Sequence, residues 1–213
     1  MEKKVQHSIN NLYKFYKEDC SIKGFAESYL KYVGRVISNI SLEEIEEFVR
    51  TLLGARDRGA VIYFIGNGGS AATASHFAND IAIGTRALEK PFRAVSLCDN
   101  QSVITAIAND DGYEHIFSQQ LEIMLEKEDV VVAISASGNS LNLMMALETA
   151  KKIGATTIGL TSFDGGDLRK KADISIHVPA EKGEYGPAED GHMVLDHLIG
   201  SYLKLRVKEE KSF

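Results

Sequence analysis

Apolar residues recur at helical spacing among charged positions through residues 8–57. The apolar positions are Ile9, Leu12, Phe15, Tyr16, Phe25, Tyr29, Leu30, Val33, Val36, Ile37, Ile45, Phe48, Val49, Leu52 and Leu53. This periodicity predicts two or three amphipathic helices. Ser41, followed three residues later by Glu44, is a capping box that would start the last of them, and Gly54 or Gly59 would end it.

After residue 59 the pattern changes to short apolar runs, each followed by a loop and a helical stretch. The runs predict strands at residues 61–65, 94–97, 130–134, 156–160 and 174–178. Helices are expected from about residue 71, after residues 99–102, and over 141–153, 168–172 and 189–208. Runs that are apolar throughout are typical of parallel strands buried on both faces. The alternation predicts an α/β fold with an open, doubly wound, five-stranded parallel sheet.

No linker or low-complexity segment interrupts this pattern, so residues 1–213 are predicted to form one domain. Its N-terminal helices would span residues 1–58 and its α/β core residues 59–213. Cys20 and Cys98 form no CxxC motif, which favours reduced thiols over a disulfide framework. The N-terminus has no apolar core of a leader peptide, and no uncharged run approaches the roughly 20 residues of a membrane span. We therefore expect a cytoplasmic protein without a membrane partner.

Glycine is abundant, with 18 residues against three prolines, and several glycines fall in the loops after the strands. Gly66-Asn67-Gly68-Gly69-Ser70 follows the first strand directly and opens a helix. Such a loop offers backbone N–H groups and the positive end of a helix to an oxyanion. The spacing is not GxGxxG and the loop lacks the lysine of a P-loop, which disfavours dinucleotides and nucleoside triphosphates. A purely structural tight turn remains an alternative.

A second loop, Ser135-Ala136-Ser137-Gly138-Asn139-Ser140, places three hydroxyl groups at another helix start. Helix capping would explain one of these serines but not all of them. The loop suits a phosphate monoester that is held without basic side chains. The net charge of −6, from 30 acidic and 24 basic residues, argues against nonspecific nucleic-acid binding, which needs a basic face. A small phosphorylated ligand is consistent with both observations.

Histidines and carboxylates gather on two of the predicted helices. His76 and Asp80 are four residues apart on the helix after the glycine-rich loop, so their side chains share one face. Glu189, His192 and His197 lie on the closing helix. Together the two sets could enclose a divalent metal ion, for which Zn²⁺ suits mixed nitrogen and oxygen ligands. A histidine taken alone is more often a hydrogen-bonded structural residue than a metal ligand, so only the combination of the two sets favours a metal site.

These motifs, in this order, resemble the sugar isomerase (SIS) domain family. The segments that carry the resemblance are Gly66-Asn67-Gly68-Gly69-Ser70, His76-Phe77-Ala78, Ala108-Asn109-Asp110, Ile134-Ser135-Ala136-Ser137-Gly138-Asn139-Ser140 and Asp164-Gly165-Gly166. Within the family, the chain is most similar to the phosphoheptose isomerase branch. The resemblance implies an α/β/α sandwich that assembles as a homotetramer with active sites shared between subunits, the N-terminal helices taking part in oligomerisation.

The resemblance also implies a reaction and a set of site residues. The reaction is the conversion of D-sedoheptulose 7-phosphate to D-glycero-D-manno-heptose 7-phosphate, which supplies heptose for surface polysaccharide. Substrate contacts are implied for Asn67, Gly68, Gly69, Asn109, Asp110, Ser135, Ala136, Ser137, Ser140 and Glu189. One Zn²⁺ ion per subunit is implied on His76, Asp80, Glu189 and His197, and Asp80 and His197 would be the catalytic acid–base pair.

Three of these positions depart from the family's pattern. The family usually has glutamate at the position of Asp80, glutamine at that of Glu189 and threonine at that of Ala136. Aspartate is shorter than glutamate by one methylene, a difference in reach of roughly 1.5 Å, and errors of about 1 Å in position can slow a reaction about 100-fold. Glu189 adds a negative charge that should favour a divalent cation and disfavour an anionic substrate nearby.

Two alternatives to this reaction remain open from the sequence. One is a noncatalytic SIS protein of the kind that associates with the DnaA initiator, a branch that loses the catalytic histidine and carboxylate. The retention of His76, Asp80 and His197 favours an enzyme. The other is an isomerase for a different phosphorylated sugar. The sequence also leaves open whether Arg86 or Arg93 reaches the phosphate, and whether residues 184–187 form a lid or a turn.

Overall fold

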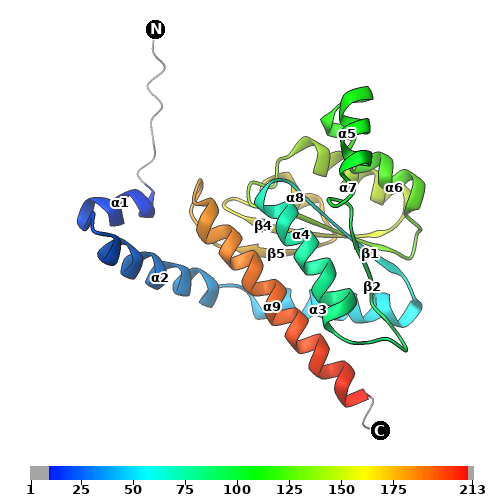
Figure 1. Ribbon diagram of the computed structural model, residues 1–213, viewed down its shortest axis with the longest axis horizontal. Helices are drawn as coiled ribbons and strands as arrows, with labels where there is room; N and C mark the ends of the chain where they lie inside the picture. The colour runs from blue at the N-terminus through cyan, green and yellow to red at the C-terminus, as the bar shows by residue number, and fades with distance from the viewer. Residues whose placement is uncertain (1–9, 211–213) are drawn as a thin grey trace.

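The computed structural model describes residues 10–210. Within that range, five parallel strands form one sheet in the order β2-β1-β3-β4-β5 (Figure 1). The strands are β1 (Val61–Gly66), β2 (Arg93–Ser96), β3 (Val130–Ser135), β4 (Thr156–Ser162) and β5 (Ile174–Val178). The predicted doubly wound, five-stranded α/β fold is confirmed.

The helices that connect and precede these strands follow the predicted alternation. They are α1 (Asn11–Glu18), α2 (Ile22–Ser38), α3 (Leu42–Arg58), α4 (Gly69–Asn79), α5 (Gln101–Asp110), α6 (Ser118–Met124), α7 (Leu141–Ile153), α8 (Gly166–Lys171) and α9 (Tyr185–Glu210). A π-helical turn, η1 (Asp80–Gly84), continues α4, and a 3-10 turn, η2 (Tyr113–His115), precedes α6.

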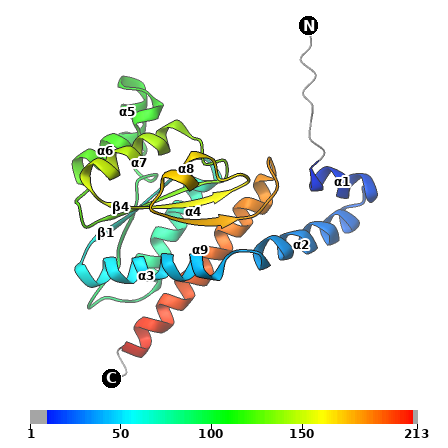
Figure 2. The same ribbon diagram turned by 180° about the vertical axis from the view of Figure 1, so that it is seen from behind.

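The central strands are buried on both faces, which creates two hydrophobic layers. In β1, Ile62 and Phe64 join the layer beneath α3, α4 and α9, whereas Tyr63 and Ile65 join the layer beneath α6, α7 and α8. Figures 1 and 2 show these two groups of helices on opposite sides of the sheet. Because successive side chains of a strand point to opposite faces, a continuous apolar run fills both layers.

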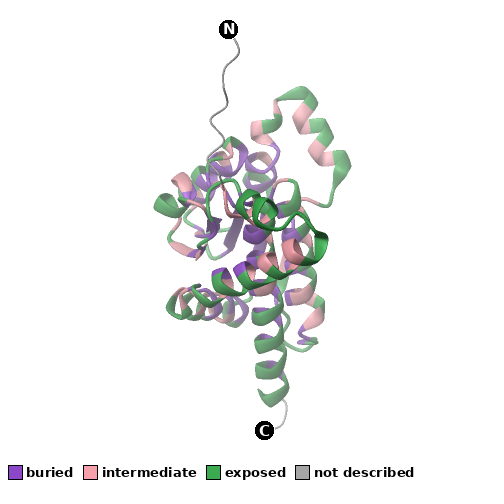
Figure 3. Cartoon of the chain, turned by 90° about the vertical axis from the view of Figure 1, so that its left-hand side faces the viewer, coloured by how far each residue is buried: buried purple, intermediate pink, exposed green. Residues whose placement is uncertain are grey.

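The N-terminal helices divide between the sandwich and a projecting arm. Helix α3 covers the sheet through the buried residues Phe48 and Leu52. Helices α1 and α2 extend away from the sheet, and α2 packs against the start of α9 (Figures 1 and 2). Viewed from the arm, the outward surfaces of these helices are mainly exposed (Figure 3), and α1 buries none of its residues.

The predicted start and end of α3 are present, with one difference. Ser41 Oγ accepts a hydrogen bond from the N–H of Glu44 at 3.2 Å, and Gly59 ends the helix in the left-handed conformation, with φ of 72°. The Glu44 carboxylate does not complete a reciprocal capping box. Instead, it accepts a hydrogen bond from the N–H of His177 at 2.9 Å and so pairs a backbone group of the edge strand β5.

Several elements differ from the expected boundaries. Helix α6 and the turns η1 and η2 were not predicted, and α9 begins four residues before the expected position 189. Residues 185–187 therefore form the first turn of a helix, where Pro187 is well tolerated because its missing N–H has no partner to lose. Ile9 lies outside the described residues. Among residues 10–210, no helix is both long and apolar enough to cross a membrane.

Candidate active site

The strand order places a crevice between the carboxyl ends of β1 and β3. The chain leaves β1 toward β2 on one side and later returns to β3 on the other, so the loops after these strands diverge. Gly66 at the end of β1 pairs with Ile134 near the end of β3. Ligands of open α/β sheets bind at such a switch point. Both loops that were predicted to hold phosphate are located there.

The glycine-rich loop after β1 leads directly into α4. Gly68 occupies the N-cap position with φ of 54° and ψ of −124°, a conformation that favours glycine. Within the described residues, no side chain caps this helix. A Cβ atom on residue 69 would lie 2.5 Å from both carboxylate oxygens of Glu189, so the backbone at Gly69 meets that side chain closely. The positive end of α4 therefore faces a carboxylate from α9.

The loop after β3 forms a small pocket of about 150 Å³ with the glycine-rich loop and the start of α9. The pocket is lined by Asn67, Ser70, Ile134, Ser135, Ala136, Ser137, Ser140, Tyr185 and Glu189. Ser135 Oγ accepts a hydrogen bond from the N–H of Gly138 at 3.0 Å, which shapes the loop. Ser140 is the N-cap of α7, but its hydroxyl makes no capping hydrogen bond and is left to the pocket.

Asn67 is held in place by two residues that the sequence analysis did not select. Its side-chain amide forms a reciprocal pair with the buried Asn142, with hydrogen bonds of 2.9 and 2.8 Å, and Tyr113 donates to Asn67 Oδ1 at 2.9 Å. Asn142 is in the first turn of α7, where asparagine is well tolerated, so the sequence carried no local signal for this contact.

The other loop glycines serve to pack two loops together. Gly138 has φ of 64°, and a Cβ atom there would lie 2.0 Å from the carbonyl oxygen of Gly165. A Cβ atom on Gly166 would lie 2.4 Å from the carbonyl oxygen of Ser137. The loop after β4 therefore supports the loop after β3 through backbone contact, and Gly165 and Gly166 act on the pocket indirectly.

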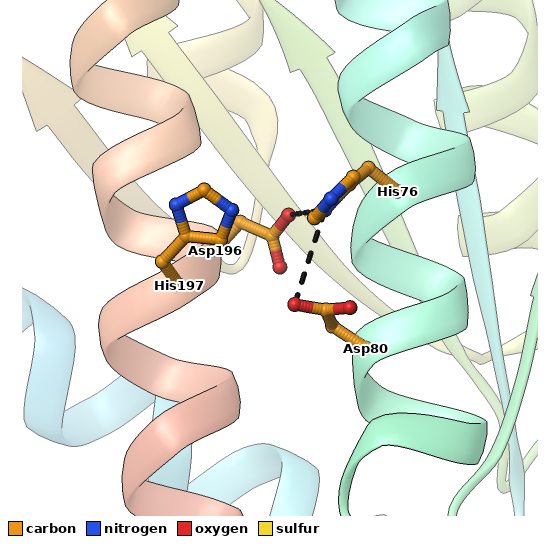
Figure 4. Close-up of side chains that lie close together, drawn as sticks. All are labelled: His76, Asp80, Asp196 and His197. Carbon is orange, nitrogen blue, oxygen red and sulfur yellow. Dashed lines mark hydrogen bonds and ion pairs between the residues drawn. The ribbon is translucent and has the colours of Figure 1, made fainter.

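Two histidines and two aspartates meet between α4 and α9, about two helical turns along these helices from the residues that line the pocket. His76 lies on α4 and Asp80 begins the π-helical turn after it, while Asp196 and His197 project from α9 toward them (Figure 4). Each residue offers one potential ligand atom, and these atoms all lie within 4.8 Å of one another. His76 Nδ1 is 2.6 Å from Asp196 Oδ2 and 3.9 Å from Asp80 Oδ2.

The members of this group, which we call the His–Asp cluster, differ in exposure. The side chain of Asp196 is fully buried, whereas those of His76 and Asp80 are 42% and 28% exposed. Burial raises the pKa of Asp196 to about 6, an effect that its hydrogen bond with His76 opposes. Asp196 Oδ1 is buried without a hydrogen-bond partner. The cluster is thus open on the side of the histidines and Asp80 and closed around Asp196.

The His–Asp cluster fits a divalent cation. It supplies nitrogen and carboxylate oxygen donors from facing helices, a combination that Zn²⁺ accepts. The buried, unpartnered oxygen of Asp196 is a polar atom that a cation would satisfy, since unpaired buried groups of this kind are costly. Asp196 was not among the predicted site residues, because a lone aspartate before His197 carries no motif.

The structure brings together only some of the predicted site residues. His76, Asp80 and His197 converge, but Glu189 is outside the His–Asp cluster because its carboxylate lies at the first residue of α4, about two turns from His76. Asn109 and Asp110 are exposed on α5 and are not among the residues that line the pocket. His192 is fully buried, and burial lowers its pKa to about 4.

The two arginines that the sequence left open have different positions. Arg93 begins β2, at the opposite end of the strand from the crevice, and donates a hydrogen bond to the carbonyl oxygen of Gly59 at 2.8 Å. Arg93 therefore makes a structural contact at the end of the sheet away from the pocket that was predicted to hold phosphate. Arg86 follows the π-helical turn and has a positive φ of 57°.

The fold and the crevice define the class of protein. A family model described as the SIS domain matches residues 28–162, and the chain belongs to this family. It is 40% identical over 156 residues to the phosphoheptose isomerase of Trichlorobacter lovleyi, covering 73% of this chain and 78% of that one. It is 37% identical over 174 residues to a probable phosphoheptose isomerase of Thermoplasma acidophilum, covering 82% and 94% of the two chains.

A solved structure gives the same assignment. The phosphoheptose isomerase GmhA of Neisseria gonorrhoeae superposes with a TM-score of 0.78 at 28% sequence identity. The match covers 86% of this chain and 98% of that one. The similarity therefore extends over the sheet and the helices that build the crevice, rather than over an isolated motif.

Proposed function

We propose that the protein is a phosphoheptose isomerase that converts D-sedoheptulose 7-phosphate to D-glycero-D-manno-heptose 7-phosphate. The observation that carries this proposal is the convergence of His76, Asp80 and His197 between α4 and α9, the two helices that also supply residues to the serine-lined pocket. The relatives named above support the same reaction along most of the chain. A noncatalytic binding protein would have no use for this convergence of acid–base groups at a crevice.

The pocket between the first and third strands would bind the phosphate. Ser135, Ser137 and Ser140 offer hydroxyl groups there, and the N-terminus of α7 provides a favourable field for an anion. Ala136 can contribute only its backbone. Asn67, Gly68 and Gly69 would contact the sugar between the phosphate and the His–Asp cluster, and Glu189 would accept hydrogen bonds from its hydroxyl groups.

Isomerisation of a ketose to an aldose needs a base that removes a proton from C1 and an acid–base group that returns a proton to C2. We assign these roles to Asp80 and His197. Both are accessible from solvent and lie in one cluster, so they can flank adjacent carbon atoms. To balance the protons, Asp80 would pass the proton taken from C1 to the oxygen on C2, which gives the enediol. His197 would then protonate C2 and take the proton from the oxygen on C1, so both groups return to their starting states.

We further propose that one Zn²⁺ ion per subunit assists the reaction. His76, Asp80 and His197 would hold it. When bound, such an ion polarises the oxygen atoms next to the reacting carbons. The phosphate is bound separately by the serine loop, which leaves the cluster to the reacting end of the sugar.

The proposed assembly is a homotetramer with shared active sites. Exposed apolar residues on the projecting arm support this proposal: Ile22 is 82% exposed and Leu30 is 70% exposed. Asn109 and Asp110, on the exposed helix α5, would contact substrate in a neighbouring subunit's site. We place the enzyme in the cytoplasm, where its product would supply heptose for surface polysaccharide.

The proposal is tested by incubating the metal-replete protein with sedoheptulose 7-phosphate and, separately, with fructose 6-phosphate. We expect heptose 7-phosphate to form, detected by NMR, and a much slower reaction with the hexose. His197→Gln should lower kcat by about 100- to 10,000-fold, the usual contribution of an acid–base group, with the subunit assembly unchanged.

Each alternative predicts a different result. Preferred turnover of fructose 6-phosphate would indicate an isomerase for another sugar. Absence of turnover with both substrates would favour a binding protein. Undiminished activity of His197→Gln would contradict the assignment of His197.

A further inference from the structure

Asp196 is a buried carboxylate, and only one of its two oxygen atoms has a hydrogen-bond partner in the protein. The residue lies on the face of α9 that packs against α4, and its side chain has no exposed surface. Oδ2 is hydrogen-bonded to His76 Nδ1 at 2.6 Å, while Oδ1 is buried without a partner. Burial of an unsatisfied polar atom is costly, and more so for a charged group.

A purely structural role accounts for only one of the two oxygen atoms. As a link between the helices, Asp196 needs Oδ2 to bind His76, and asparagine would serve equally well. Such a role leaves Oδ1 buried and unsatisfied. A cation at the cluster accounts for both oxygen atoms. The Asp196 carboxylate supplies one of the ligand atoms that lie within 4.8 Å of one another, and Oδ1 and Oδ2 are attached to the same carbon, so an ion there is within reach of the buried Oδ1.

Charge leads to the same conclusion. Asp80 and Asp196 bring two carboxylates toward one point from two helices. Two ionised carboxylates balance the charge of a divalent cation. Glu189 does not share this position, since its carboxylate lies against Gly69.

We propose that Asp196 is a direct ligand of the divalent metal ion and completes a two-histidine, two-aspartate set with His76, Asp80 and His197. The inference rests on the metal assistance proposed above and changes its ligand set. Asp196 takes the place that the family resemblance gave to Glu189, and Glu189 is left to the substrate pocket. In this ligand set, Asp196 on α9 supplies a second carboxylate opposite Asp80, whose side chain is shorter than the family's usual glutamate.

The test measures metal binding rather than turnover. Metal-free protein is titrated with Zn²⁺ in competition with a chromophoric chelator, and with Co²⁺ while the visible absorption of the cobalt is recorded. The variants are Asp196→Asn, which can still accept a hydrogen bond from His76, and Glu189→Gln as the matched control. Circular dichroism of the metal-free variants checks that they are folded.

We expect one Zn²⁺ per wild-type chain. Asp196→Asn should bind at least tenfold more weakly and give a changed cobalt spectrum, whereas Glu189→Gln should bind within about threefold of the wild type. Loss of a supporting hydrogen bond alone can also weaken a metal site by about 10- to 100-fold, so the spectrum decides between the two roles. A smaller loss of affinity, or an unchanged cobalt spectrum, would overturn the proposal.

A second measurement covers the case in which Asp196→Asn does not fold. In crystals of the wild-type protein grown with Zn²⁺, anomalous diffraction should place the ion within bonding distance of Asp196 Oδ1. An ion bonded to Glu189 instead would reject the inference. Turnover of sedoheptulose 7-phosphate is measured separately. If the wild type is active but Asp196→Asn binds metal as the wild type does, this inference alone is refuted. If metal binding is as expected but the wild type is inactive, the proposed function alone is refuted.

Discussion

At the scale of the residue, the position of Asp80 depends on the glycines that surround it. Asp80 has glycine neighbours: a Cβ atom on Gly200 of α9 would lie 3.5 Å from Asp80 Cβ, and one on Gly84 would lie 3.7 Å from it. The facing helix can therefore approach the short aspartate closely. Close approach of α9 to Asp80 can therefore compensate for the methylene group that aspartate lacks relative to the family's usual glutamate.

Gly69 offers a test of how closely the Glu189 carboxylate must be positioned. In Gly69→Ala, the added methyl group would lie 2.5 Å from both carboxylate oxygens of Glu189 and displace them. Because the displaced atoms end a flexible side chain, the fold should be little affected. We expect kcat/KM for sedoheptulose 7-phosphate to fall about 10- to 100-fold, since errors near 1 Å can cost about 100-fold, with Tm changed by less than about 4 °C.

The control is Gly54→Ala on α3, where the new methyl group would meet only the end of the Arg58 side chain at 3.3 Å. That variant should keep wild-type kinetics. Equal activity of Gly69→Ala and the wild type would show that Glu189 has no fixed role in the pocket.

At the scale of the element, the packing of α9 on the sheet encloses His192. Its Nε2 lies 3.3 Å from the carbonyl oxygen of Thr161 in β4, and burial lowers its pKa from 6.5 to about 4. Protonation thus favours the unfolded chain. The stabilising contribution is complete above about pH 6.5 and is lost as the pH falls toward 4; its size is on the order of 3 kcal/mol.

We therefore expect the free energy of unfolding, measured in urea, to decrease between pH 7 and pH 4.5 in the wild type. His192→Gln, which keeps a donor for Thr161 but does not titrate, should decrease less over the same range. His115→Gln, outside the core, is the matched control and should follow the wild type. If His192→Gln also follows the wild type, His192 does not account for acid destabilisation.

The elements themselves were largely predictable from the sequence, and the contacts between them were not. Each strand and the helices α3, α4, α7 and α9 follow from periodicity and capping residues, because these signals are local. The early start of α9 was missed because Gly186 and Pro187 are typical of turns, although proline is tolerated in the first turn of a helix. Glu44 was correctly placed at the start of α3, but its bond to β5 is a long-range contact that no local pattern specifies.

At the scale of the molecule, the sheet order explains which parts of the site the sequence could supply. The loops after β1 and β3 were identified as ligand loops, and the switch point between these strands brings them together. The grouping of His76 and Asp80 with His197 was proposed from their spacing on two predicted helices, and the family resemblance implied the same set. Asp196 and Asn142 were missed because their roles arise only when distant helices and loops meet.

The assignment as an isomerase rests on proton transfer at the carbon atoms next to the carbonyl group. This chemistry can be followed directly by dissolving sedoheptulose 7-phosphate and the metal-replete protein in D₂O and recording NMR spectra. A base that exchanges with solvent should introduce deuterium at C1 of the ketose and at C2 of the heptose 7-phosphate formed. Recovery of sedoheptulose 7-phosphate with both C1 protons intact and no heptose 7-phosphate would contradict the account.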